Sequence, residues 1–283
     1  MNPLLNEDIE ISISGVRQLN ELVMKRYGFD MSRYALTSFK RRLVRFLEKN
    51  DIRSLELFLK RLEKDDDLFK KFLSSQSVEV TELFRDPALW RSFRDDILPV
   101  MAKHHSSIKI WIPGCSTGEE VASAIIILKE ANLFDRAEII ATDITEGIVK
   151  TIINRVYPVS KYEYSEANYK RYNPEGETDF SKYAKMEKNG FKVADSLFQN
   201  TTFLKYDYSE DLKIRGINVI LCRNNFIYYT AQFQEKLLEL FSSKLAFNGY
   251  LIIGNKENID WCKDNARYSI VNESEKVYRK TSP

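Results

Sequence analysis

The segment around Gly114 constrains the fold of this chain more than any other. The apolar run Ile108–Ile112 predicts a strand, Gly114 begins a tight glycine turn, and a helical pattern follows Gly118. This order of strand, turn and helix start lets backbone approach a bound ligand closely. We therefore expect a nucleoside-type ligand at the carboxyl end of this strand.

Two carboxylates, Glu119 and Glu120, open the helix where a dinucleotide site needs bare N–H groups for a pyrophosphate. They would repel a phosphate and attract a cation, which favours S-adenosylmethionine with its sulfonium and ammonium groups. A second apolar run ends in Asp143, about 25 residues after the glycine turn, the spacing at which an acid meets ribose hydroxyls. The alternative is that all three acids only match a helix dipole or form turns.

Size and composition indicate a globular protein. The chain has 283 residues, of which 43% are hydrophobic and 30% charged, which is enough for two domains. A net charge of +2 gives no drive toward nucleic acid. No apolar run is long enough to span a membrane and the first residues lack a secretory signal, so we expect a cytoplasmic protein without direct membrane insertion. The three cysteines form no CxxC pair, and we expect no metal site.

Two kinds of pattern divide the chain near residue 78. Residues 1–78 show apolar positions at three- and four-residue spacing, which predicts an all-α N-terminal domain. Residues 79–283 alternate apolar strands with helices, which predicts an α/β domain with a mostly parallel sheet. We expect strands at Ile108–Ile112, Glu138–Thr142, Thr202–Lys205, Asn218–Cys222 and Tyr250–Gly254, and helices near 119–131, 146–154 and 231–245.

The end of the chain departs from this alternation. Arg267–Val271 and Lys276–Arg279 flank a turn-like stretch and predict a hairpin, so the sheet should close with an antiparallel strand. That arrangement is typical of Rossmann-like methyltransferases that use S-adenosylmethionine. Between about 160 and 200, an Asn-Gly pair predicts a small β-hairpin insertion.

Polar motifs follow other strands and precede the first one. Asp207-Tyr208 comes after the third strand, Cys222-Arg223-Asn224 ends the fourth, and Thr81–Pro87 lies between the helical part and the sheet. In an open parallel sheet, ligands bind beyond the carboxyl ends of the strands. Asp143 and the first two of these motifs fall there.

Together these segments resemble the CheR-type chemotaxis receptor methyltransferases over nearly the whole chain. The resemblance implies an enzyme, a protein-glutamate O-methyltransferase that transfers a methyl group from S-adenosylmethionine to chemoreceptor glutamates in sensory adaptation and leaves S-adenosylhomocysteine. The motifs that carry it are Tyr27-Gly28-Phe29-Asp30, Lys40-Arg41-Arg42, Thr81–Pro87, Gly114-Cys115-Ser116-Thr117-Gly118-Glu119-Glu120, Thr142-Asp143-Ile144, and Cys222-Arg223-Asn224 with Ile227-Tyr228.

The resemblance also assigns roles to particular residues. Its proposed catalytic pair falls on Arg85 and Tyr228, although Arg85 could instead form an interdomain ion pair and Tyr228 could be a core aromatic. The chain departs from the family at Glu79 and Asp207, where Asn is common. The family's cofactor contacts fall on Thr81, Arg85, Glu120, Asp143, Asp207, Tyr208, Cys222 and Arg223, and Gly114 and Asn224 complete the predicted cofactor site.

The implied protein substrate is the cytoplasmic helices of chemoreceptors, which a basic face could dock. Basic residues recur at mostly helical spacing, although a charge run of this kind is more often a solvated face. We expect a monomer. Two alternative functions stay open: a carboxyl methyltransferase of a non-chemotaxis signalling system, and a cofactor-binding sensor or scaffold with little turnover. The residues of the predicted docking face are Lys40, Arg41, Arg42, Arg45 and Lys49.

Overall fold

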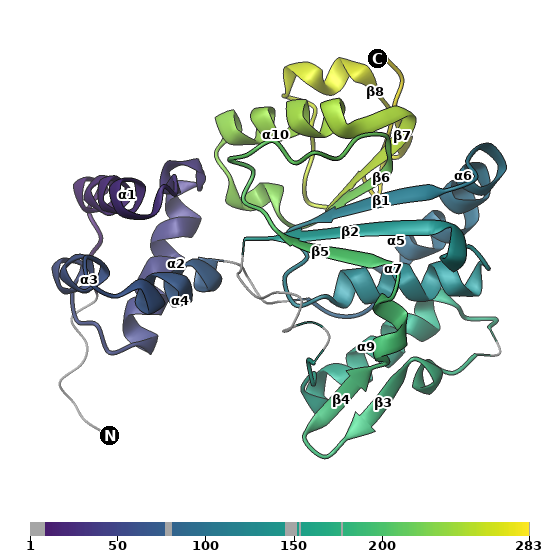
Figure 1. The fold of residues 1–283 in the computed structure, drawn as a ribbon, viewed down its shortest axis with the longest axis horizontal. Coiled ribbons are helices and arrows are strands. Elements are labelled where there is room, and N and C mark those ends of the chain that lie inside the picture. Colours follow the sequence, from purple (N-terminus) through teal and green to yellow (C-terminus); the bar gives the residue numbers. More distant parts are fainter. Residues whose placement is uncertain (1–8, 77–80, 145–151, 153, 177, 283) are drawn as a thin grey trace. The chain divides into compact units, whose positions relative to one another are not determined.

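The computed structural model describes residues 9–76, 81–144, 152, 154–176 and 178–282. Its contacts define two compact units, whose helices and strands are labelled in Figure 1. The first contains the chain up to Val78 together with Ile227–Gln234, and the second contains Glu79–Phe226 and Glu235–Pro283. The short segment Ile227–Gln234 therefore packs with the N-terminal unit. Every helix within the described ranges is too short or too polar to cross a membrane.

The N-terminal unit is all-α, as its apolar spacing predicts. Its helices are α1 (Ile13–Tyr27), α2 (Leu36–Lys49), α3 (Leu55–Leu62) and α4 (Asp66–Gln76). The side chains of Ser12 and Ser54 cap α1 and α3 by accepting backbone N–H groups, and Gly28 ends α1 with a φ of 66°. Phenylalanine rings form the centre of the bundle. The ring centroid of Phe72 lies 6.3, 5.2 and 5.0 Å from those of Phe39, Phe46 and Phe58.

The second unit contains a large, mostly parallel sheet. Its strands are β1 (Ile108–Pro113), β2 (Ala137–Asp143), β5 (Thr201–Lys205), β6 (Ile217–Cys222), β7 (Leu245–Ile253), β8 (Tyr268–Asn272) and β9 (Val277–Lys280). Their order is β5-β2-β1-β6-β7-β9-β8. The first five strands in this order are parallel, and β9 is antiparallel to both β7 and β8. The expected parallel sheet with an antiparallel terminal strand is confirmed.

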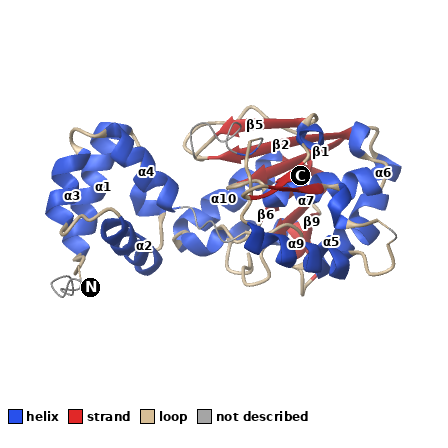
Figure 2. Cartoon of the chain, turned by 90° about the horizontal axis from the view of Figure 1, so that it is seen from below, coloured by secondary structure: helices blue, strands red, loops and turns tan. Residues whose placement is uncertain are grey.

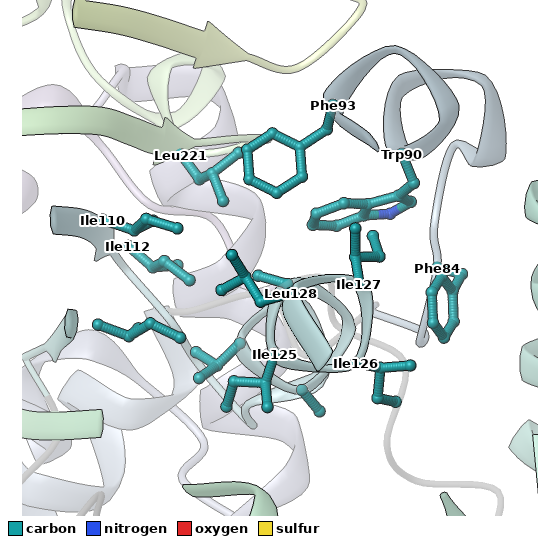
Figure 3. Close-up of a cluster of buried hydrophobic side chains, with 14 of the residues drawn as sticks. Phe84, Trp90, Phe93, Ile110, Ile112, Ile125, Ile126, Ile127, Leu128 and Leu221 are labelled. Atoms are coloured by element: carbon teal, nitrogen blue, oxygen red, sulfur yellow. The ribbon is translucent and has the colours of Figure 1, made fainter. Parts of the chain in front are cut away.

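Different helices cover the two faces of this sheet (Figure 2). The helices are α5 (Pro87–Ser92), α6 (Leu98–His104), α7 (Glu119–Glu130), α9 (Val159–Tyr172) and α10 (Ala231–Lys244), whose start groups with the N-terminal unit. Trp111 of β1 packs edge-to-face on Phe241 of α10, with ring centroids 5.3 Å apart. On the other face, Ile110 and Ile112 join a buried cluster with the isoleucines of α7 and the ring of Trp90 (Figure 3). Alternate residues of β1 thus serve two cores.

The insertion combines a hairpin with a helix. The predicted hairpin is present as β3 (Ala184–Glu187) and β4 (Gly190–Val193). Helix α9 was not expected, and most of the helix expected at 146–154 lies outside the described residues. Hydroxyls of Tyr169, Tyr172 and Tyr183 all donate to the carboxylate of Glu130 at the end of α7. These bonds give buried polar groups the partners that they need and fix the insertion to the sheet unit.

The variant Phe72→Ala tests the core of the N-terminal unit. It removes a fully buried ring, and such truncations cost about 3–5 kcal/mol. We expect the unfolding free energy of this unit, measured by urea titration with circular dichroism, to fall by about that amount. Met24→Ala, at an exposed position of α1, should change it by less than about 0.5 kcal/mol. Equal losses in both variants would contradict this account of the core.

Candidate functional site

The carboxyl ends of the parallel strands bring the predicted cofactor residues to one edge of the sheet. From β1 the chain first builds β2 and β5 on one side and then β6 and β7 on the other, so the strand order reverses beside β1. Ligands of open α/β sheets bind at such a reversal. Residues 114, 143, 207–208 and 222–224 lie at or just after the ends of β1, β2, β5 and β6.

The glycine turn after β1 has the close packing that its sequence predicts. Gly114 has a φ of 70°, and its N–H donates to the carbonyl of Thr142 at 2.7 Å. A Cβ on Gly114 would lie 2.0 Å from the side-chain nitrogen of Asn225 in the loop after β6, so a larger residue would displace that side chain, and the positive φ itself favours glycine. Gly118 ends the turn with a φ of 89° as the N-cap of α7.

Asp143, at the end of β2, is directed toward the same turn. The residue is buried, and its Oδ2 accepts the N–H of Ser116 at 2.9 Å. Ser116 has left-handed backbone with a φ of 47°. This bond fixes the carboxylate beside the glycine turn, a position that suits a ribose-binding acid. That role stays a prediction.

Arg223 joins segments that lie far apart in the sequence. Its side chain is 1% exposed and forms ion pairs with Asp86 and with Glu120, where Nη1 lies 3.1 Å from Oε2. The guanidinium carbon lies 5.8 Å from the ring centre of Trp90. A buried guanidinium needs such partners because an uncompensated buried charge is costly. Arg223 therefore connects the end of β6 to the loop before α5 and to the start of α7.

The adjacent acids Glu119 and Glu120 have different environments. Glu119 is fully buried, and its Oε1 lies 2.9 Å from the Nζ of Lys161, which also donates to the carbonyl of Thr81 at 2.8 Å. The Glu120 side chain keeps 18% exposure; burial raises its pKa, while Arg223 and more weakly Arg85 act to lower it. The sequence suggested that both acids attract a cationic ligand, but Lys161 already meets the charge of Glu119. Glu79, another residue of interest, lies outside the described residues.

Arg85 lies between two residues with left-handed backbone. Phe84 has a φ of 54° and Asp86 a φ of 57°, conformations that cost about 1–3 kcal/mol each and persist only where surrounding contacts hold them. The ring of Phe84 stacks on Tyr172 with centroids 5.1 Å apart, and the Arg85 carbonyl accepts from Trp90 Nε1 at 2.9 Å. These contacts fix the point from which the Arg85 side chain extends.

The residues after β5 have local contacts as well. Asp207 Oδ1 accepts the N–H of Ser209 at 2.9 Å. The ring centroid of Tyr208 lies 5.3 Å from that of Tyr206. Cys222 is fully buried, and burial raises the pKa of its thiol well above the ordinary value, with Tyr208 acting in the opposite direction. The cofactor contacts expected for Asp207, Tyr208 and Cys222 stay predictions.

The loops after β6 and β7 are joined by Glu257. This buried residue accepts the N–H groups of Asn224 and Gly254 on its Oε2, at 2.9 and 2.6 Å. Asn224 itself has left-handed backbone with a φ of 54°. The bonds hold Asn224 beside Arg223 at the carboxyl edge of the sheet.

The sequence did not predict a role in this site for four residues, Asp86, Trp90, Lys161 and Glu257. Asp86 lies inside the Thr81–Pro87 motif, so a signal for it existed. No local pattern indicates the other three, because their roles depend on contacts with segments distant in the sequence.

Tyr228, the second predicted catalytic residue, groups with the N-terminal unit. Its carbonyl accepts the N–H of Ala35 at 2.8 Å, and the guanidinium carbon of Arg42 lies 4.9 Å from its ring centre. Arg42 is 6% exposed, which corrects the prediction that it forms part of a docking face. It lies three and four residues from Phe39 and Phe46 and therefore shares their buried side of α2. The docking candidates that remain are the half-buried Lys40 and the exposed Arg41, Arg45 and Lys49.

The groups at the carboxyl edge suit a ligand that carries a cation, hydroxyls and a carboxylate. Glu120 and Asp143 supply negative charge, Arg85 supplies positive charge near enough to act on the pKa of Glu120, and Gly114 provides a turn without a side chain. A pyrophosphate would instead meet the carboxylate of Glu120. The residues present therefore fit S-adenosylmethionine.

Comparison with known proteins identifies the family of this chain. Residues 79–277 match the family described as CheR methyltransferase, SAM binding domain, and residues 14–75 match CheR methyltransferase, all-alpha domain. A relative from Pseudomonas putida, named "Putative methyltransferase Cher3", is 31% identical over 276 residues, 98% of each chain. Chemotaxis protein methyltransferases of Listeria monocytogenes and Borreliella burgdorferi are 25% and 24% identical, over 84% and 90% of this chain and 87% and 91% of their own. The chain therefore belongs to the CheR methyltransferase family, with an all-α domain followed by a domain that binds S-adenosylmethionine.

Proposed function

We propose that this protein transfers the methyl group of S-adenosylmethionine to glutamate side chains of chemoreceptors in the cytoplasm, giving glutamate methyl esters. The observation that supports this most is the position of Glu120 and Asp143 at the carboxyl edge of the sheet in a chain of this family. Two relatives are named chemotaxis protein methyltransferases. The choice of glutamate rests on the resemblance to that family.

The substrate needs little chemical activation. A glutamate side chain with an ordinary pKa of about 4.3 is ionised at neutral pH and can attack without a general base. When bound, S-adenosylmethionine supplies a methyl group made electrophilic by its positively charged sulfur. Transfer of that methyl group to a glutamate oxygen would break the carbon–sulfur bond and leave its electron pair on sulfur, as in S-adenosylhomocysteine. The task of the protein is to aim the carboxylate and to exclude water.

Each proposed role follows from the chemistry of the side chain. The planar guanidinium of Arg85 orients a carboxylate, either that of the substrate or that of the cofactor. Tyr228 steers the substrate with its ring and hydroxyl. Glu120 holds the ammonium of the cofactor, and Asp143 holds its ribose. The helical domain, residues 1–78, docks the receptor helices through its exposed basic residues.

The variant Asp143→Ala tests the ribose contact. It should weaken binding of S-adenosylhomocysteine by at least about tenfold, because a hydrogen bond to a charged group is worth about 1.5–3 kcal/mol. Isothermal titration calorimetry measures the affinity. Glu138→Ala removes an exposed carboxylate of the same strand and should leave the affinity unchanged. Tight binding that survives in Asp143→Ala would refute this role.

The pH dependence of binding tests Glu120. Protonation of Glu120 removes the charge that holds the ammonium, so affinity for S-adenosylhomocysteine should fall as the solution is acidified. Because burial raises the pKa of Glu120, the fall begins at a higher pH than an ordinary glutamate would give. Glu120→Gln should bind about tenfold more weakly at neutral pH and vary less on acidification. Calorimetry at stepped pH decides this, and parallel pH profiles for both proteins would contradict the assignment.

Methyl transfer tests the function itself. Wild-type protein, a chemoreceptor cytoplasmic fragment and radiolabelled S-adenosylmethionine should yield base-labile label, as glutamate methyl esters do. Arg85→Ala should lower the rate by about 100-fold or more, the usual effect of removing one preorganised charge. Arg85→Lys should restore only part of it, since lysine lacks the bidentate fork.

Arg279→Ala, at an exposed position of β9, is the control and should keep the wild-type rate. Three results would contradict the proposal in different ways. Label that survives base excludes an ester. Label only on proteins other than chemoreceptors favours a different signalling system. Binding of S-adenosylhomocysteine without any transfer favours a sensor or scaffold.

A further inference from the structure

The environment of Arg42 differs from that of the basic residues beside it on α2. Arg41 and Arg45 are exposed, whereas Arg42 is buried. A buried charge is costly unless a partner compensates it. Arg42 Nε donates to Gln76 Oε1 at 3.3 Å, but its Nη2 has no hydrogen-bond acceptor in the described part of the chain.

Aromatic ring faces meet the charge of Arg42 instead. The guanidinium carbon lies 4.9 Å from the ring centre of Tyr228 and 5.6 Å from that of Tyr34. A guanidinium within about 6 Å of a ring centre is attracted to the ring, and more strongly when water is excluded. Burial lowers the pKa of Arg42, and both tyrosines act against this shift. The ring of Tyr228 therefore lies against a cation that has few other partners.

Backbone pairing holds the same segment to the N-terminal unit. Tyr34 and Tyr229 form an antiparallel bridge, and their ring centroids lie 5.4 Å apart. Residues 33–35 and 228–230 thus pair like two short strands. Hydrogen bonds run from the Ala35 N–H to the Tyr228 carbonyl and from the Thr230 N–H to the Arg33 carbonyl, both at 2.8 Å.

We propose that Arg42 is a positioning residue for Tyr228 in the methyl-transfer step. The inference rests on the proposed function, in which Tyr228 contacts the substrate. Backbone pairing and the guanidinium act together, because the cation that packs on one face of the Tyr228 ring also stabilises the paired backbone beside it. Loss of that contact makes other rotamers of the half-buried ring easier to reach, and a displacement of about 1 Å in an active site can cost about 100-fold in rate.

Steady-state kinetics of Arg42→Met test this role. With a chemoreceptor fragment that the wild-type protein methylates, kcat should fall at least tenfold, while the KM for the fragment and the affinity for S-adenosylhomocysteine stay within twofold. Arg42→Lys keeps a cation and should recover at least threefold of the lost rate. Arg53→Met makes the same change at an exposed position of the same unit and should keep the wild-type kcat. A raised KM with unchanged kcat in Arg42→Met would mean that Arg42 binds the receptor, and would overturn the proposal.

A double-mutant cycle tests whether Arg42 acts through Tyr228. Residues that act as a unit give effects that do not add. In a Tyr228→Ala background, Arg42→Met should therefore change kcat by less than twofold. A tenfold fall in that background as well would show that Arg42 acts independently of the tyrosine.

Hydrogen exchange tests the contact without any receptor. In Arg42→Met the amides of Ala35 and Thr230 should exchange at least fivefold faster, while those of α3 keep their rates. Unchanged exchange at both amides would overturn the proposal even if kcat falls.

A second variant covers the case in which Arg42→Met unfolds the N-terminal unit, which circular dichroism detects. Gln76→Leu keeps the cation but removes the acceptor of its Nε, and should lower kcat at least threefold with the same change in exchange. Wild-type values in Gln76→Leu would then count against positioning. If wild-type protein labels no receptor fragment, the proposed function fails, whereas the exchange rates still decide whether Arg42 orders the Tyr228 segment.

Discussion

The buried charge of Arg223 is the interaction on which the carboxyl edge of this sheet depends. Its guanidinium lies between Asp86 and Glu120, so it ties three segments together that are distant in the sequence. Loss of either acid would leave a buried cation short of a partner, and breaking a buried pair in this way costs about 3–5 kcal/mol. The same contact favours the ionised form of Glu120, whose burial alone would favour the neutral one. One arginine therefore organises the loops and also maintains the negative charge that a cationic ligand requires.

Left-handed backbone occurs in the turn after β1 and on both sides of Arg85, and the structure accommodates it in two ways. At Gly114 the φ of 70° favours glycine, and a Cβ there would displace the side chain of Asn225. Phe84 and Asp86 instead have side chains whose contacts stabilise the left-handed backbone. The ring of Phe84 packs on Tyr172, and the carboxylate of Asp86 pairs with Arg223. The backbone strain at the two residues that flank Arg85 is thus offset by the side-chain contacts of those same residues. Backbone strain of this kind is typical of functional sites, which supports a precise role for Arg85.

Local patterns were enough to predict the framework of the site. The strand, turn and helix around Gly114 are encoded within a short segment, and Asp143 could be placed because it ends an apolar run. The sequence did not predict helix α9 because its buried face contains tyrosines, such as Tyr169 and Tyr172, instead of aliphatic residues. Their hydroxyls are buried because they donate to the carboxylate of Glu130, a partner that is distant in the sequence. The contacts of Arg223 and Lys161 could not be predicted, since each joins residues that no periodicity relates.

Two pairs of adjacent like charges have environments that the sequence pattern does not distinguish. Successive residues of a helix point about 100° apart, so neighbours can lie in different environments. Glu119 is directed inward to Lys161 while Glu120 keeps contact with solvent; Arg42 is directed inward to aromatic rings while Arg41 is exposed. In each pair the buried charge has a fixed partner within the protein, so it acts mainly by holding geometry. Arg41 is exposed, whereas Glu120 is part-buried and is itself paired with Arg223. Adjacent like charges in this chain therefore do not form single binding surfaces, because one member of each pair is directed into the protein.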